Sequence, residues 1–76
     1  MRPTHEQSNA FLAHEPLPGV AFEHNAYVRV VSGEHAGDSG SVISVEQLGQ
    51  DPVYLVELES NSDAPIPQSC LRLVEG

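Results

Sequence analysis

Basic residues are scarce in this sequence. Three Lys and Arg residues stand against 11 Asp and Glu residues, which gives a formal net charge of -8 over 76 residues. A field of this sign repels nucleic-acid phosphates and anionic lipid headgroups, and few cations are present to displace counterions on binding. We therefore expect nucleic acid to be an unfavourable partner, and we expect no membrane partner.

Cysteine and long apolar runs are scarce as well. Cys70 is the only cysteine, so no disulfide can form within the chain. No stretch of about 18 apolar residues is present, and the first residues, MRPTHEQSNAFLAHEPLPG, hold neither an apolar run nor a cluster of positive charge. The sequence predicts one small cytoplasmic domain whose stability depends on packing alone.

Catalytic and metal-binding patterns are also missing. A catalytic thiol needs a base within hydrogen-bond reach, and we expect Cys70 to be buried instead as a small hydrophobic residue. The four histidines are 9, 10 and 11 residues apart, so no two of them share one face of a helix or strand. We expect no enzymatic activity, no metal and no cofactor. The histidines are His5, His14, His24 and His35.

The first 19 residues differ from the rest of the chain. They contain three prolines and a terminal glycine, which break helices and strands, although EQSNAFLAHE is compatible with two turns of helix. A helix of this length is marginal in water unless it docks. We expect residues 1–19 to form a flexible or weakly docked tail, or a short helix, and residues 20–76 to form the folded domain.

The remaining residues show the pattern of an all-β fold. YVRVVS, SVISVEQ, VYLVELE and LRLVE are short runs rich in β-branched residues, separated by turn residues. LGQDP is expected to join two of them as an antiparallel hairpin, and ESNSDAPIP is expected to be a polar loop before a helical turn at QSC. Because the runs are apolar on nearly both faces, we expect a sheet that curls and closes on itself.

The stretch VRVVSGEHAGDSGSVISV, residues 28–45, places three glycines between two valine-rich runs. This spacing resembles the KOW motif, in which a V-x-V strand precedes glycines four and three residues apart and a second apolar strand. The resemblance extends over about residues 22–75 and implies a five-stranded SH3-like barrel, as in large-subunit ribosomal proteins and transcription elongation factors. The matching positions are Val28, Val30, Gly33, Gly37, Gly40, Val42 and Val45.

The three glycines have a geometric explanation that does not depend on the resemblance. A tight connection between curved strands requires positive φ angles and a close approach of two backbones, both of which a Cβ obstructs. We therefore expect Gly33, Gly37 and Gly40 to be structural turn residues, with Gly40 the most constrained. Members of the family that bind nucleic acid usually carry Lys or Arg in this loop, where this chain has Glu34 and Asp38.

The remaining function class is a binding module. We expect an acidic rim, with a few apolar groups beside it, to bind a protein with a basic surface. Two alternatives stay open: a ribosome- or RNA-associated accessory factor acting through the loop backbone and Arg29, and an acidic inhibitor or immunity-type protein. A free strand edge allows either a monomer or a homodimer. The candidate partner-binding residues are Tyr27, Arg29, Glu34, His35, Asp38, Tyr54, Glu57 and Ile66; the rim also includes Glu59, Asp63 and Glu75.

Overall fold

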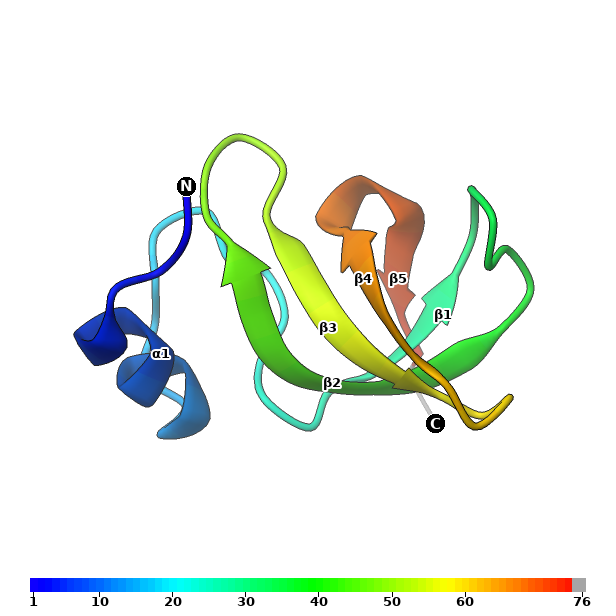
Figure 1. Ribbon diagram of the computed structural model, residues 1–76, viewed down its shortest axis with the longest axis horizontal. Coiled ribbons are helices and arrows are strands. Elements are labelled where there is room, and N and C mark those ends of the chain that lie inside the picture. The colour runs from blue at the N-terminus through cyan, green and yellow to red at the C-terminus, as the bar shows by residue number, and fades with distance from the viewer. Residues whose placement is uncertain (75–76) are drawn as a thin grey trace.

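The computed structural model describes residues 1–74 and contains one five-stranded antiparallel sheet with a short helix at one end (Figure 1). The elements are α1 (His5–Leu12), β1 (Tyr27–Val30), β2 (Ser39–Gln47), β3 (Val53–Leu58), β4 (Asp63–Pro67), the 3-10 helix η1 (Gln68–Cys70) and β5 (Leu71–Leu73). The strand order is β4-β3-β2-β1-β5, so the first and last strands of the sequence are neighbours.

Buried residues occupy every second position of β1 and β3. Val28 and Val30 are buried while Tyr27 and Arg29 are exposed, and the inward residues of β3 are buried in the same way. Since successive side chains of a strand point to opposite faces, one face of the sheet forms the core and the other faces solvent. We call the solvent-facing side the outer face. The main strand residues of the core are Val28, Val30, Val42, Val45, Tyr54, Val56, Leu58, Ile66 and Leu71.

The long strand β2 bends because it contains two irregularities. Val42 pairs with Val56, and the next pair is Ser44 with Leu55, so Ile43 is an extra residue on the β2 side. A bulge of this kind shifts the alternation by one residue and increases the local twist. Val42 and Val45 therefore both point into the core although their spacing is odd. A second register shift follows between Val45 and Gln47, and the bent strand runs the length of the sheet in Figure 1.

Strand β4 corrects the expectation that residues 59–67 form a polar loop. Asp63–Pro67 pairs with β3 over its whole length, and only the preceding residues form the turn. Gln68 N–H donates to Pro52 O at 2.7 Å, and Leu58 N–H donates to Ser62 O at 2.9 Å. The backbone groups of successive β4 residues point alternately toward β3 and away from it. The nitrogens of Pro65 and Pro67 therefore face the open edge of the sheet, where the missing N–H removes no hydrogen bond between strands. The prolines therefore blunt this edge against pairing with another chain.

Two of the three motif glycines adopt the backbone conformation expected of them. Gly33 and Gly37 have φ angles of 90° and 95°, in the turn between β1 and β2. Gly40 differs, because it lies within β2, where it pairs with Val28, and its φ is not positive. A Cβ at this position would lie 2.0 Å from the carbonyl oxygen of Glu57 on β3. The constraint at Gly40 is thus the close approach of two strands, and the expectation of a turn there is wrong.

The N-terminal segment forms the short helix that was one of its two expected states. Thr4 caps α1, because its hydroxyl accepts from Gln7 N–H at 3.1 Å while the Gln7 side chain accepts from Thr4 N–H at 2.8 Å. Phe11 is only 3% exposed and belongs to the core, so the helix docks through this ring. Met1 also exchanges backbone hydrogen bonds with Leu48. The attachment is therefore closer than the weak docking expected for this segment.

Candidate binding surface

The outer face carries charged side chains arranged by strand register. Tyr27 on β1 faces Ser41 on β2, Ser41 faces Glu57 on β3, and Glu57 faces Asp63 on β4. A parallel row runs beside it, in which Arg29 faces Arg72 on one side and Ser39 on the other. The β4 side of the outer face is therefore acidic, the β5 side is basic, and the serines of β2 separate the two.

Within residues 1–74, no Lys or Arg forms an ion pair on the acidic side of the outer face. Glu57 and Asp63 face each other directly across β3 and β4, an arrangement that opposes folding through like-charge repulsion. Over residues 1–74 the only contact within 4 Å between a basic and an acidic side chain is His14 with Glu23, at 3.6 Å, outside this surface. We call Asp38, Glu57, Glu59 and Asp63 the acidic strip.

Hydrogen bonds hold part of the acidic strip in place. Asp38 accepts from Ser60 Oγ at 2.7 Å and from Ser39 N–H at 2.8 Å, which fixes its carboxylate between the β1–β2 loop and the β3–β4 turn. The hydrogen bond from Ser60 and the one from the Ser39 backbone lower the pKa of Asp38 below its ordinary value of 3.8. This carboxylate therefore stays charged under mildly acidic conditions.

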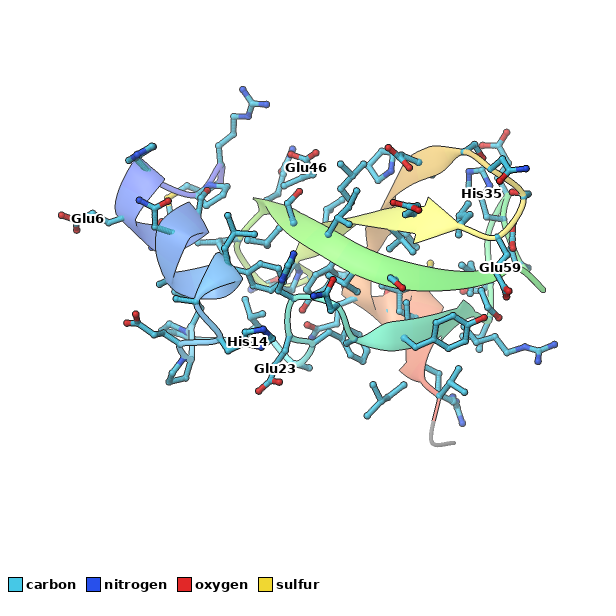
Figure 2. The ribbon with its side chains drawn as sticks, turned by 90° about the horizontal axis from the view of Figure 1, so that it is seen from below. Glu6, His14, Glu23, His35, Glu46 and Glu59 are labelled. Carbon is cyan, nitrogen blue, oxygen red and sulfur yellow. The ribbon has the colours of Figure 1, made fainter. Side chains whose placement is uncertain are left out.

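Tyr27 connects β1 to the acidic strip. Its hydroxyl donates to Glu59, whose own N–H donates to Ser39 O at 2.8 Å. The hydrogen bond to Glu59 raises the pKa of Tyr27 above its ordinary value of 10.0, because it stabilises the protonated phenol. Tyr27 is 40% exposed, so an amphipathic side chain of the kind common in interfaces lies beside the carboxylates. Figure 2 shows Glu59 at the end of the sheet far from α1.

Two of the predicted partner-binding residues are not on the surface. Tyr54 is fully buried and Ile66 is 3% exposed, so the prediction that they contact a partner is wrong. Both residues point inward from paired strands, where Tyr54 faces Ile66. The Tyr54 hydroxyl donates to Gln68 Oε1 and accepts from Ala21 N–H at 3.2 Å, and burial raises the pKa of this phenol. Tyr54 thus connects three segments of the core.

Glu34 and His35 lie in the β1–β2 loop next to Asp38 of the acidic strip, and Asp38 N–H donates to His35 O at 3.1 Å. They line a shallow hollow of about 220 Å³ between the β1–β2 loop and η1, with Ile66 and Cys70 in its wall. Cys70 is half-buried and packs against the core, so it is less buried than expected. Figure 2 places His35 at the same end of the sheet as Glu59. The predicted acidic rim, which includes Glu34 and the acidic strip, stays a prediction as a binding site, and Glu75 lies outside the described residues.

The histidines show one association that their spacing did not predict. The His14 and His24 rings lie 5.8 Å apart, and His24 also meets Phe11 edge-on at 6.4 Å. Within residues 1–74, no group of three or more His, Cys, Asp or Glu side chains is arranged to hold a metal ion. In the same part of the chain, no helix is long and apolar enough to cross a membrane.

Sequence reasoning did not include Arg72 or Ser60 among the candidate partner-binding residues. Arg72 becomes relevant only because β5 returns beside β1, which places it opposite Arg29. Ser60 becomes relevant because the β3–β4 turn folds back onto Asp38. Alternation within LRL was the one available signal, since it predicts that Arg72 points away from the buried Leu71.

Comparisons of this chain with protein-family models, with curated proteins and with solved structures find no match. The proposed function is therefore based on the arrangement of the outer face.

Proposed function

We propose that this protein is a non-enzymatic binding module that docks a basic segment of another protein on the acidic strip. The observation that carries the proposal is the cross-strand pair Glu57 and Asp63, which repel each other and have no cation within 4 Å among the described residues. A partner that supplies Lys or Arg relieves this repulsion, so part of the binding free energy comes from removing an unfavourable interaction. The exposed Tyr27 ring adds apolar contact area beside the strip.

We further propose that the sheet belongs to the SH3-like barrel class with a KOW-type first hairpin. The proposal is supported by the strand order, by η1 between the two edge strands and by the bulges that bend β2. It is also supported by the positive φ angles of Gly33 and Gly37 at the positions that the motif reserves for glycine.

Affinity capture from the source cell tests the proposed function. The bait is the wild-type protein, compared with the double variant Glu57→Gln, Asp63→Asn, which keeps shape and removes two charges. We expect a basic protein to bind the wild type at low salt, to dissociate as salt shortens the Debye length from about 30 Å to 3 Å, and to bind the variant much less. Capture that is equal for both baits or indifferent to salt contradicts the proposal.

RNA association is a second candidate, favoured by one observation. Arg29 and Arg72 face each other on the outer face, and neither contacts a carboxylate within residues 1–74. Guanidinium groups bind phosphates in a bidentate geometry. Filter binding at about 10 mM salt, where screening is weakest, decides this alternative, because failure to retain RNA under that condition eliminates it.

A further inference from the structure

The arginine pair and the acidic strip are complementary surfaces on one face of one molecule. We propose that two copies of this chain associate outer face to outer face, with Arg29 and Arg72 of each copy on the acidic strip of the other. This self-association uses the same strip as the proposed basic partner, so the two compete. The proposal does not depend on that function, because it is tested with the purified protein alone.

Arg29 and Arg72 form a like-charge pair on the outer face. Arg29 and Arg72 are opposite each other on β1 and β5, so they repel, and both are exposed. In a chain with 11 acidic residues, neither has a carboxylate within 4 Å over residues 1–74. The outer face thus carries one basic and one acidic like-charge pair, and neither pair has an ion-pair partner within residues 1–74.

Apolar side chains gather around the same pair. Six large hydrophobic residues are exposed within residues 1–74, and four of them lie on or next to the β1–β5 ladder. Three of these four accompany the arginines. Val31 is 43% exposed, Tyr27 is 40% exposed and Val74 is 38% exposed. Val31 N–H donates to Cys70 O and Val74 N–H donates to Tyr27 O, each at 2.8 to 3.0 Å, which extends the ladder at both ends. Exposed apolar groups around unpaired arginines are the composition of an interface core.

The register makes this surface self-complementary. The arginines lie on β5 and β1, the Glu57–Asp63 pair lies on β3 and β4, and β2 runs between these two pairs. Glu59 follows β3, and Asp38 lies in the β1–β2 loop directly before β2. A two-fold axis along β2, between two facing copies, superposes β1 and β5 of one copy on β3 and β4 of the other. Each basic pair then lies against an acidic strip, and the same contact occurs twice.

The curvature of the sheet limits the size of the contact. Figure 1 shows β2 and β3 strongly bent, so two outer faces can touch over only part of their area. Interfaces of this kind lie at the low end of the size range, below about 1,200 Å² of total buried area, and give weak association. We therefore expect a concentration-dependent equilibrium between monomer and dimer that is strongest at low salt.

Charge-reversal variants test the proposal by sedimentation equilibrium. Arg29→Glu and Glu57→Arg each convert a like-charge cross-strand pair into an opposite-charge pair within the monomer, so neither is expected to unfold the protein. Each one places like charges across the proposed dimer contact, and we expect dimer formation to decrease at least tenfold. Arg2→Glu and Glu15→Arg are matched controls, since they change the net charge equally at exposed sites near α1, outside the arginine pair and the acidic strip.

A mixture of the two variants gives the decisive result. When Arg29→Glu and Glu57→Arg are combined in equal amounts, both contacts become complementary again, so we expect a heterodimer to form. Three results overturn the proposal: a wild-type protein that stays monomeric at low salt and high concentration, reversal variants that associate as the wild type does, and a mixture that does not recover association. Circular dichroism of each variant establishes that the fold is intact.

Discussion

Gly40 illustrates how a single missing side chain permits the strand pairing. The carbonyl oxygen of Glu57 lies where a Cβ of residue 40 would stand, at 2.0 Å, and backbone cannot move aside as a flexible side chain does. We predict that Gly40→Ala destabilises the protein by about 1–3 kcal/mol or more, the usual cost of overpacking. Urea unfolding measures the effect. Gly37→Ala is the comparison, because nothing lies within 4 Å of its Cβ, and its cost comes only from the φ of 95°.

An unfolding midpoint of Gly40→Ala equal to that of the wild type would contradict the close approach of β2 and β3 at this residue.

Asp38 makes stability depend on pH. Its pKa is lower in the folded state than the ordinary 3.8, so its hydrogen bonds stabilise the fold above that pH and are lost as the pH falls toward the folded-state value. We predict that Asp38→Ala lowers the melting temperature at about pH 7, and that the difference from wild type narrows at about pH 2. Glu34→Ala is the matched control for net charge. A difference in melting temperature that is the same at about pH 7 and about pH 2 would show that the charge of the Asp38 carboxylate does not stabilise the fold.

At the scale of elements, α1 depends on one aromatic ring. Phe11 is the only helix residue in the core, whereas its neighbour Leu12 is 48% exposed. We predict that Phe11→Ala costs about 3–5 kcal/mol and releases the helix, which is too short to persist alone. Leu12→Ala is expected to change little. Thermal unfolding and helical circular dichroism measure both variants, and equal behaviour of the two would show that α1 does not dock through Phe11.

The elements differ in how well the sequence predicts them. Strands β1 and β3 follow from alternation, because Val28, Val30 and the inward residues of β3 repeat every second position. Strand β4 could not be predicted in this way, since its inward residues are Ala64 and Ile66 and it contains two prolines. Its pairing depends on β3 accepting a partner that leaves both proline nitrogens at the open edge.

The residues of the candidate site also differ in how well the sequence predicts them. Tyr27, Arg29 and Glu57 were predicted to be on the surface because they occupy the polar positions of alternating strands, and they are exposed. Tyr54 occupies an apolar position of its strand, and its burial follows from the same alternation once it is applied strictly. The Arg29–Arg72 and Glu57–Asp63 pairs could not be predicted, because the register between strands is set by the packing of the whole sheet.

At the scale of the whole molecule, the net charge of -8 is distributed unevenly over the surface. Two of the three basic residues lie at one side of the outer face, and the acidic strip lies at the other. Long-range attraction of a cationic partner comes from the total charge, while the strip determines where that partner docks. This distinction separates specific binding from general attraction between opposite charges.

An NMR titration with a short arginine-rich peptide tests the location most directly. The account predicts that the largest amide shift changes at low salt occur at Asp38, Glu57, Glu59 and Asp63. They should be smaller in the Glu57→Gln, Asp63→Asn variant and disappear at high salt. If the largest changes instead occur near Glu15 and Glu23, or persist unchanged in the variant, the acidic strip is not the docking site.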